Sequence, residues 1–230
     1  MIKNKTVLAV IPARAGSKRL PNKNIIDLNG KPLIVWSINA GLGSKYIDEL
    51  IVSTDSKKIA TIAKRAGSDV PFIRPKALAT DTATSYDVAA HALKHYQNRF
   101  DIIILLQPTS PLRTSRDIDA ALEFFMKNKA NAVVSVCETE HSPLLCNVLP
   151  KDLSMKGFLK NKLKKARSQE LPKYYRINGG LYIVSVKNFL KEKTFFLSKK
   201  IYAYVMPKDR SVDIDNKSDL DFAKFLIRRK

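Results

Sequence analysis

Cysteine is scarce in this chain of 230 residues: Cys137 and Cys146 are the only two, and their spacing fits neither a metal site nor a redox motif. We interpret both as free thiols, which are typical of a reducing cytoplasm. Long apolar runs are also missing, since a run such as Ile102 to Leu106 is far shorter than the ~20 residues of a membrane span. Too few apolar residues precede Pro12 for a signal peptide. The sequence therefore favours a cytoplasmic protein without a membrane partner.

The two common phosphate-loop motifs are absent as well, because the chain contains neither G-x-x-x-x-G-K-[ST] nor G-x-G-x-x-G. A different loop, PARAGSKRLPNKN at 12–24, follows an apolar strand expected at 6–11. Gly16 lets the backbone turn tightly and approach a ligand, and Ser17 adds a neutral hydrogen-bond donor. The positive charges of this loop come from Arg14, Lys18, Arg19 and Lys23. We expect a strand, an anion-binding loop and then a helix at this place.

Acidic residues are few beside basic ones: 21 Asp and Glu stand against 41 Lys and Arg, which gives a net charge of +20. Such a balance suits a polyanionic partner. The lysines are spread over the whole sequence, however, which favours the simpler interpretation that they occupy exposed helix faces. The basic stretch from Lys162 to Arg167 keeps open a second class, a non-catalytic nucleic-acid-binding protein. No RNA-binding aromatic motif accompanies it, so we expect no nucleic-acid partner.

Apolar strands alternate with amphipathic helices through the first 137 residues. Strands are expected at 6–11, 50–53, 102–106 and 132–136, and later at 180–186 and 202–205; helices are expected around 59–66, 85–97, 114–126 and 216–227. Apolar strands with helical crossovers predict an α/β fold, a three-layer sandwich with a mainly parallel sheet. We expect one domain over residues 1–230, with an excursion from the sheet at 139–175. Ligands should bind at the carboxyl ends of the strands.

Asp213 and Asp215 are separated by a single residue. In an extended segment such residues face the same side, and paired carboxylates suit Mg²⁺. A second interpretation is that Asp215 caps the helix that begins near Asn216. Arg176 is followed by an Asn-Gly-Gly turn, and arginine binds a planar carboxylate or phosphate through two parallel hydrogen bonds.

Seven segments, in order along the chain, resemble motifs of the CMP-sialic acid synthetases, also called acylneuraminate cytidylyltransferases. They are IPARAGSKRLPNKN at 11–24, IVSTDS at 51–56, RPKALATDTATS at 74–85, LLQPTSPLR at 105–113, VVSVCETEHSPL at 133–144, RINGGLYI at 176–183 and SVDIDN at 211–216. The chain departs from the family pattern at Ile177, where the R-P-N-G motif of the family has proline.

The resemblance implies a role for individual residues. It implies that CTP is bound by Arg14, Ser17, Asn24, Arg74, Ala83 and Ser85, with Arg74 and the Ala83 backbone reading cytosine and Ser85 near the ribose. It implies a sugar-acid site of Gln107, Arg176, Phe195 and Phe196, although ordinary core packing is an equally good interpretation of the two phenylalanines. The catalytic set is then Arg14, Lys18, Lys23, Asp213 and Asp215, with Mg²⁺ on the two aspartates.

The reaction implied by the resemblance joins CTP to a nine-carbon 2-keto sugar acid and releases pyrophosphate. The sequence does not choose among neuraminate, legionaminate and pseudaminate types. A cytidylyltransferase for the eight-carbon acid of lipopolysaccharide core is the nearest alternative, because that family also opens with an IPAR loop. The family further implies a homodimer, in which residues 139–175 form the dimerisation element.

Overall fold

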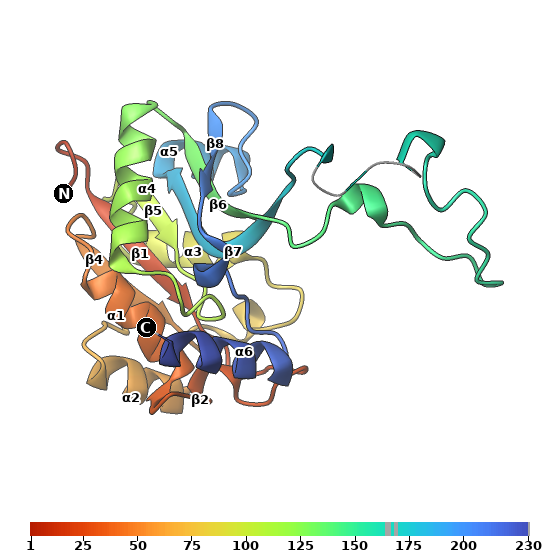
Figure 1. Ribbon diagram of the computed structural model, residues 1–230. Helices are drawn as coiled ribbons and strands as arrows, with labels where there is room; N and C mark the ends of the chain where they lie inside the picture. Colours follow the sequence, from red (N-terminus) through yellow and green to blue (C-terminus); the bar gives the residue numbers. More distant parts are fainter. Residues whose placement is uncertain (164–166, 168–169, 230) are drawn as a thin grey trace.

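The computed structural model describes residues 1–163, 167 and 170–229. Its centre is a six-stranded sheet with the strand order β4-β1-β5-β7-β6-β8 (Figure 1). The strands are β1 (Val7–Pro12), β4 (Glu49–Ser53), β5 (Ile102–Leu105), β6 (Ala132–Glu138), β7 (Tyr175–Ser185) and β8 (Ile201–Val205). Strands β1, β4 and β5 pair in parallel, as do β6 and β8, whereas β7 is antiparallel to both of its neighbours. The expectation of a mainly parallel sheet is therefore confirmed.

Helices cover both faces of the sheet, which gives the predicted three layers (Figure 1). They are α1 (Leu33–Leu42), α2 (Lys57–Arg65), α3 (Ser85–His95), α4 (Ser115–Lys127), α5 (Val186–Glu192) and α6 (Lys217–Arg228). One core cluster joins α1, α2 and α4 to side chains such as Ala9 and Ile11 of β1. A second cluster joins α3 and α5 to Leu8 and Val10, the alternate residues of the same strand. This alternation follows from the two-residue period of a strand.

Polar side chains cap the first turns of four helices, α2, α3, α4 and α6. Thr114 caps α4 and forms a capping box with Asp117. Asn216 caps α6 and forms a capping box with Asp219. The cap of α6 is therefore Asn216, and Asp215 is left for another role.

The segment that follows the basic loop differs from the expectation of a helix. It forms a short 3₁₀ helix at Lys23–Ile25 and then a hairpin of β2 (Asp27–Leu28) and β3 (Lys31–Pro32). Asn22 adopts a left-handed conformation with φ of 56°, which bends the chain directly after Pro21. The hairpin packs against α6 around Leu28, Leu33 and Leu220, so α1 begins one hairpin later than predicted.

The described residues between 139 and 174 extend away from the sheet as an arm (Figure 1). Its described part contains two 3₁₀ helices, Pro143–Leu145 and Asn161–Leu163, and otherwise irregular backbone. Half of the basic stretch at 162–167, namely 164–166, lies outside the described residues. No helix in the part of the chain that the structure describes is both long and apolar enough to cross a membrane.

Candidate active site

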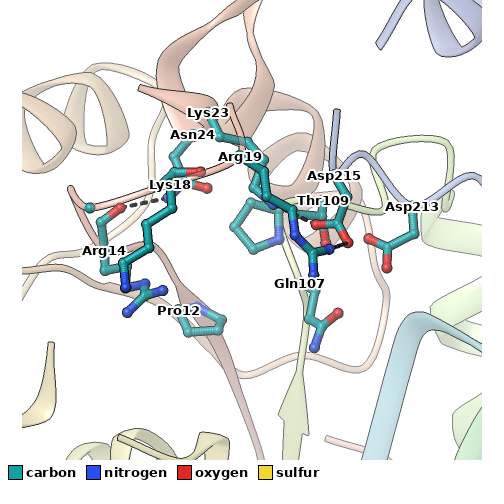
Figure 2. Close-up of a pocket in the computed structure, with 13 residues that line it drawn as sticks. Pro12, Arg14, Lys18, Arg19, Lys23, Asn24, Gln107, Thr109, Asp213 and Asp215 are labelled. Carbon is teal, nitrogen blue, oxygen red and sulfur yellow. Dashed lines mark hydrogen bonds and ion pairs between the residues drawn. The ribbon is translucent and has the colours of Figure 1, made fainter. Parts of the chain in front are cut away.

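A cavity of about 470 Å³ opens at the carboxyl ends of β1 and β5. It brings together residues that are far apart in the sequence but were predicted to share a site: Arg14, Ser17, Lys18, Lys23, Asn24, Gln107, Asp213 and Asp215. Figure 2 shows Arg14 and Lys18 on one side of this space and Asp213 and Asp215 on the other, with the side chain of Arg19 extending to Asp215. Parallel strands place their following loops at the same edge of the sheet, which explains why these loops meet.

The basic loop is held in shape by hydrogen bonds to its own backbone. The Asn24 amide donates to the Arg14 carbonyl at 2.8 Å, and the Ala15 N–H donates to an Asp55 carboxylate oxygen at 2.9 Å. Asn24 is buried and lines the cavity, and its hydrogen bond to the Arg14 carbonyl fixes the loop backbone. The loop therefore has a defined conformation before any ligand binds.

Asp81 is the carboxylate that meets the outer cations of this loop. Its two oxygens lie 2.8 Å from Nη2 of Arg14 and 2.6 Å from Nζ of Lys18. Hydrogen bonds from Lys18 and Arg14 hold the pKa of Asp81 below its usual value. An anionic ligand of the loop competes with Asp81 for these two cations.

Asp213 and Asp215 have different surroundings. Asp215 accepts from Lys23 and Arg19, each at 2.9 Å, and the hydrogen bond from Lys23 is the main reason that its pKa is lowered. Asp213 is accessible from the cavity, but the protein around it removes water and raises its pKa, against a hydrogen bond from Thr109. Among the described residues, no cation lies within salt-bridge distance of Asp213.

These two carboxylates fit a hard divalent cation. Asp213 is an accessible carboxylate without a salt-bridge partner in the described chain, so its oxygens are available to bind a cation. No cluster of three or more His, Cys, Asp or Glu side chains suited to a metal exists among the described residues. A cation at this place would thus take one or two carboxylates from the protein and complete its shell with water and substrate oxygens, as Mg²⁺ commonly does.

Gln107 connects this cavity to a second one of about 300 Å³. Ser85, Phe195 and Phe196 line the second cavity, together with Tyr182. Phe195 is buried in the core against Phe189, whereas the side chain of Phe196 is half exposed and forms part of the wall. Phe195 therefore packs in the core and lines the second cavity at once, and Phe196 lines the same cavity from a more exposed position.

The two residues expected to read the nucleotide base, Arg74 and Ala83, lie outside both cavities. Arg74 is buried, and its guanidinium donates to the carbonyls of Ser53 at 2.9 Å and Leu78 at 3.3 Å. Burial lowers the pKa of Arg74. The Ala83 N–H donates to the Thr80 hydroxyl at 3.2 Å. Both residues belong to the segment at 74–83. This segment lines neither cavity, but its Asp81 contacts Arg14 and Lys18 at the border of the first one.

Arg176 is part of β7, not of a glycine-rich turn as the sequence suggested. The strand continues through Asn178 and Gly179 because the backbone forms a bulge there, with Gly179 at φ of 71°. Nη2 of Arg176 donates to the Ser211 carbonyl at 3.2 Å and lies 3.4 Å from Glu140. Arg176 lines neither cavity.

Sequence reasoning did not single out Thr109 or Ser211, and it named Asp81 only as the first residue of a loop at 81–85 expected to select the nucleotide; all three residues contact the predicted site residues. Thr109 lies within the LLQPTSPLR segment and Ser211 immediately precedes Val-Asp-Ile-Asp, so proximity to the motifs was the available signal. Asp81 lies within the RPKALATDTATS segment, but its contact with Arg14 could not be foreseen, because it depends on how two distant loops meet.

Comparison with known proteins identifies the family to which the chain is similar. A profile of the family described as Cytidylyltransferase matches residues 8–229. The chain is 39% identical over 217 residues to the N-acylneuraminate cytidylyltransferase of Streptococcus agalactiae serotype V, a match that covers 92% of this chain and 51% of that protein. The chain therefore spans about half the length of this relative.

Shorter relatives match over nearly their whole length. The pseudaminic acid cytidylyltransferase of Campylobacter jejuni is 35% identical over 224 residues, with 96% of each chain covered. The CMP-N,N'-diacetyllegionaminic acid synthase of Legionella pneumophila is 39% identical over 222 residues, with 93% of this chain and 92% of that protein covered. A solved CMP:2-keto-3-deoxy-manno-octonic acid synthetase in complex with CTP has a TM-score of 0.71 at 19% identity and covers 97% and 99% of the two chains, a likeness of fold alone.

Proposed function

This chain belongs to the cytidylyltransferase family, and we propose that it transfers the cytidylyl group of CTP to a nonulosonic acid, releasing pyrophosphate. The observation that carries the proposal is the first cavity, which combines a preformed cationic loop with two accessible carboxylates at one edge of the sheet. A triphosphate and a divalent cation are the partners that such a pair of features suits.

In this proposal, Arg14, Ser17, Lys18 and Lys23 bind the triphosphate and stabilise the departing pyrophosphate. Arg14 and Lys18 exchange Asp81 for phosphate oxygens when CTP binds. Asp213 and Asp215 hold Mg²⁺, which supplies charge neutralisation at the phosphates. Lys23 lies between the two halves of the site, since it reaches Asp215 in the free protein and lines the same cavity as the loop.

The nucleoside half of CTP lies, in this proposal, toward Asn24, Arg74, Ala83 and Ser85. Arg74 now donates to the carbonyls of Ser53 and Leu78, so its contact with cytosine requires a rearrangement of the segment at 76–84. Ser85 lines the second cavity beside Gln107.

The sugar acid occupies the second cavity in this proposal, with Phe196 as a wall and Gln107 at the boundary with the triphosphate. Its anomeric 2-hydroxyl attacks the α-phosphorus in line. Arg176 is the candidate for its carboxylate, and reaching it requires the guanidinium to turn from Glu140 toward the site. The relatives named above act on neuraminate, pseudaminate and legionaminate types, which leaves the nine-carbon acid itself to be identified by assay.

A substrate panel tests the proposal. Pyrophosphate release is measured with CTP, Mg²⁺ and either a nine-carbon acid of each of the three types or the eight-carbon 2-keto-3-deoxy acid. We expect turnover with at least one nine-carbon acid and none without an acid. A preference for the eight-carbon acid supports the alternative cytidylyltransferase. Oligonucleotide binding with a steep salt dependence, and no pyrophosphate release, supports the nucleic-acid-binding alternative.

We further infer that the protein works in the cytoplasm, because both Cys137 and the exposed Cys146 are free thiols. A homodimer built on the arm is also part of the proposal. The exposed apolar side chains of the arm, which include Val148 and Leu153, support it.

A further inference from the structure

We propose that Asn178 is a positioning residue that clamps the Asp213 segment against β7 through Ser211 and thereby sets the geometry of the cation site. The inference rests on the proposed function, because it concerns the same site.

The clamp begins at an irregularity in β7. Val136 of β6 pairs with Ile177, but Val134 pairs with Tyr182, so residues 178–181 of β7 bulge opposite Ser135. The bulge brings Gly179 against the cavity wall: a Cβ atom at this position would lie 2.7 Å from Oε1 of Gln107 and 3.7 Å from Oδ2 of Asp213. Bulges commonly direct backbone and side chains toward a site, and this one faces Gln107 and Asp213 of the first cavity.

Asn178 lies inside this bulge with only 1% of its surface exposed. Its Oδ1 accepts from the Ser135 hydroxyl at 2.6 Å and from the Gly180 N–H at 3.1 Å. Its Nδ2 donates to the Ser211 hydroxyl at 2.8 Å, and that hydroxyl donates to the Pro207 carbonyl at 2.7 Å. The hydrogen bonds therefore run in one direction from β6, through the asparagine, to the segment that carries Asp213.

That segment needs such an anchor because it has little regular structure. Between β8 and α6 it contains only the 3₁₀ helix Lys208–Arg210. Asp213 lies between two attachments: the buried Ser211, held by Asn178, and Ile214, whose N–H donates to the Thr109 carbonyl at 2.8 Å. Loss of the Asn178 contact leaves this side of Asp213 held by two more exposed attachments, the hydrogen bond from Arg176 to the Ser211 carbonyl and the ion pair between Arg210 and Asp117. Small displacements of a metal ligand weaken both binding and catalysis.

The test compares Ser211→Ala with Ser211→Thr, which keeps the hydroxyl, and with the control Ser68→Ala. Ser68 is also buried and its hydroxyl donates to a backbone carbonyl, that of Leu50 at 3.3 Å, but it lies after α2, far along the chain from Asp213. We expect Ser211→Ala to raise the Mg²⁺ concentration for half-maximal activity by about 10-fold, the size of effect seen when support for a metal ligand is lost. Ser211→Thr and Ser68→Ala should stay near the wild-type requirement.

Hydrogen exchange of the segment at 206–216, measured without Mg²⁺ or CTP, gives a readout that does not depend on activity. Ser211→Ala should speed exchange there, and Ser68→Ala should not. If Ser211→Ala does not fold, Ser211→Cys fills the same space with a weaker hydrogen-bonding group and should show the same two effects.

An unchanged Mg²⁺ requirement in a folded Ser211→Ala or Ser211→Cys enzyme overturns the proposal, as does an equal change in Ser68→Ala. Failure of the proposed function has a different result, namely a wild-type protein that releases no pyrophosphate from CTP with any acid.

Discussion

At the residue scale, the two carboxylates of the site differ in their partners, and this difference predicts how their variants behave. Asp213 has no cationic partner among the described residues, whereas Asp215 is paired with Lys23 and Arg19. We expect Asp213→Asn to lower kcat by ~100-fold or more with a small change in the KM for CTP. Asp215→Asn should lower kcat similarly and also change the KM for CTP, because it releases two cations beside the triphosphate.

The control for these variants is Asp209→Asn. Asp209 is an exposed carboxylate on the same segment and lines neither cavity, so its removal should leave the kinetics unchanged. Full activity of Asp213→Asn, or of the wild type in the presence of a chelator, would show that the cation site is assigned to the wrong residues.

Arg14 and Arg113 form a second contrast. Arg14 is partly exposed in the loop, whereas Arg113 is fully buried, donates to the Gly180 carbonyl at 2.7 Å, and has its pKa lowered to about 10 by burial. Arg14→Ala should change the free energy of unfolding by less than ~1 kcal/mol but lower kcat/KM for CTP by about 10- to 150-fold. Arg113→Ala should cost about 2–4 kcal/mol of stability.

Urea unfolding and steady-state kinetics on the same preparations separate the two effects. A strongly destabilised Arg14→Ala protein with normal kinetics would make Arg14 a structural residue instead of a ligand-binding one.

The sequence predicted most of the residues of the first cavity, because each lies in a loop that follows a recognisable strand or precedes a recognisable helix. Gln107 and Asp213 are examples. It could not predict Asn178 as a link to Ser211, since that contact depends on a bulge in β7. Nor could it place Arg74 against the carbonyl of Ser53, because sequence patterns do not show where a buried cation finds acceptors.

At the element scale, strands and amphipathic helices were easier to predict than elements without a pattern. The strand β5 and the helix α2 appear within a residue or two of their expected positions. A helix was expected after the basic loop, but the bounds of α1 were not predicted, because its sequence LIVWSINAGL is apolar on nearly all sides and lacks a polar face. The antiparallel direction of β7 was equally hidden, since its apolar residues resemble those of a parallel strand and the long arm before it allows either direction.

The ion pair between Arg210 and Asp117 connects α4 to the segment that carries Asp213. Arg210 donates from Nε and Nη2 to the two carboxylate oxygens at 3.0 and 2.9 Å, and the Asp117 side chain is almost fully buried. Arg210→Ala leaves a buried carboxylate with only its Thr114 partners, so we expect a loss of about 2 kcal/mol at pH 7 in urea unfolding.

This stability difference should depend on pH. Burial opposes the ionisation of Asp117, but hydrogen bonds from Arg210 and Thr114 outweigh burial and hold its pKa below the usual value. A carboxylate with a lowered pKa stabilises the fold above its unfolded-state pKa of about 4, and that contribution disappears as the pH falls through the lowered value. The gap between wild type and Arg210→Ala should be constant from pH 5 to 8 and shrink in acid. A gap that grows in acid would contradict this account.

At the scale of the whole molecule, the described part of the arm at 139–174 extends from the sheet instead of packing against it. Its apolar side chains include Val148, Leu153 and Met155, which are 87%, 70% and 61% exposed. Exposed apolar groups that lie together mark interaction surfaces. We expect a homodimer in light scattering at micromolar concentration and a monomer for the double variant Val148→Asp, Leu153→Asp. A fully active wild-type monomer would contradict a dimer built on this arm.

The position of the site on the sheet was predictable from the sequence, but its division into two cavities was not. A mainly parallel sheet with ligands at its carboxyl edge follows from alternating strands and helices, as seen for the loops after β1 and β5. The division of the site into two cavities that meet at Gln107 was not predictable, because it depends on how β7 and α5 pack beside β5.

The most direct test of the central claim is ³¹P NMR of the reaction mixture with CTP, Mg²⁺ and a nine-carbon acid. The account predicts that the three phosphorus signals of CTP give way to one phosphodiester signal and to pyrophosphate, in equal molar amounts and only when the acid is present. The same mixture with Asp213→Asn should keep its CTP signals over the same period. Consumption of CTP without acid, or formation of CDP and phosphate in place of pyrophosphate, would contradict cytidylyl transfer at this site.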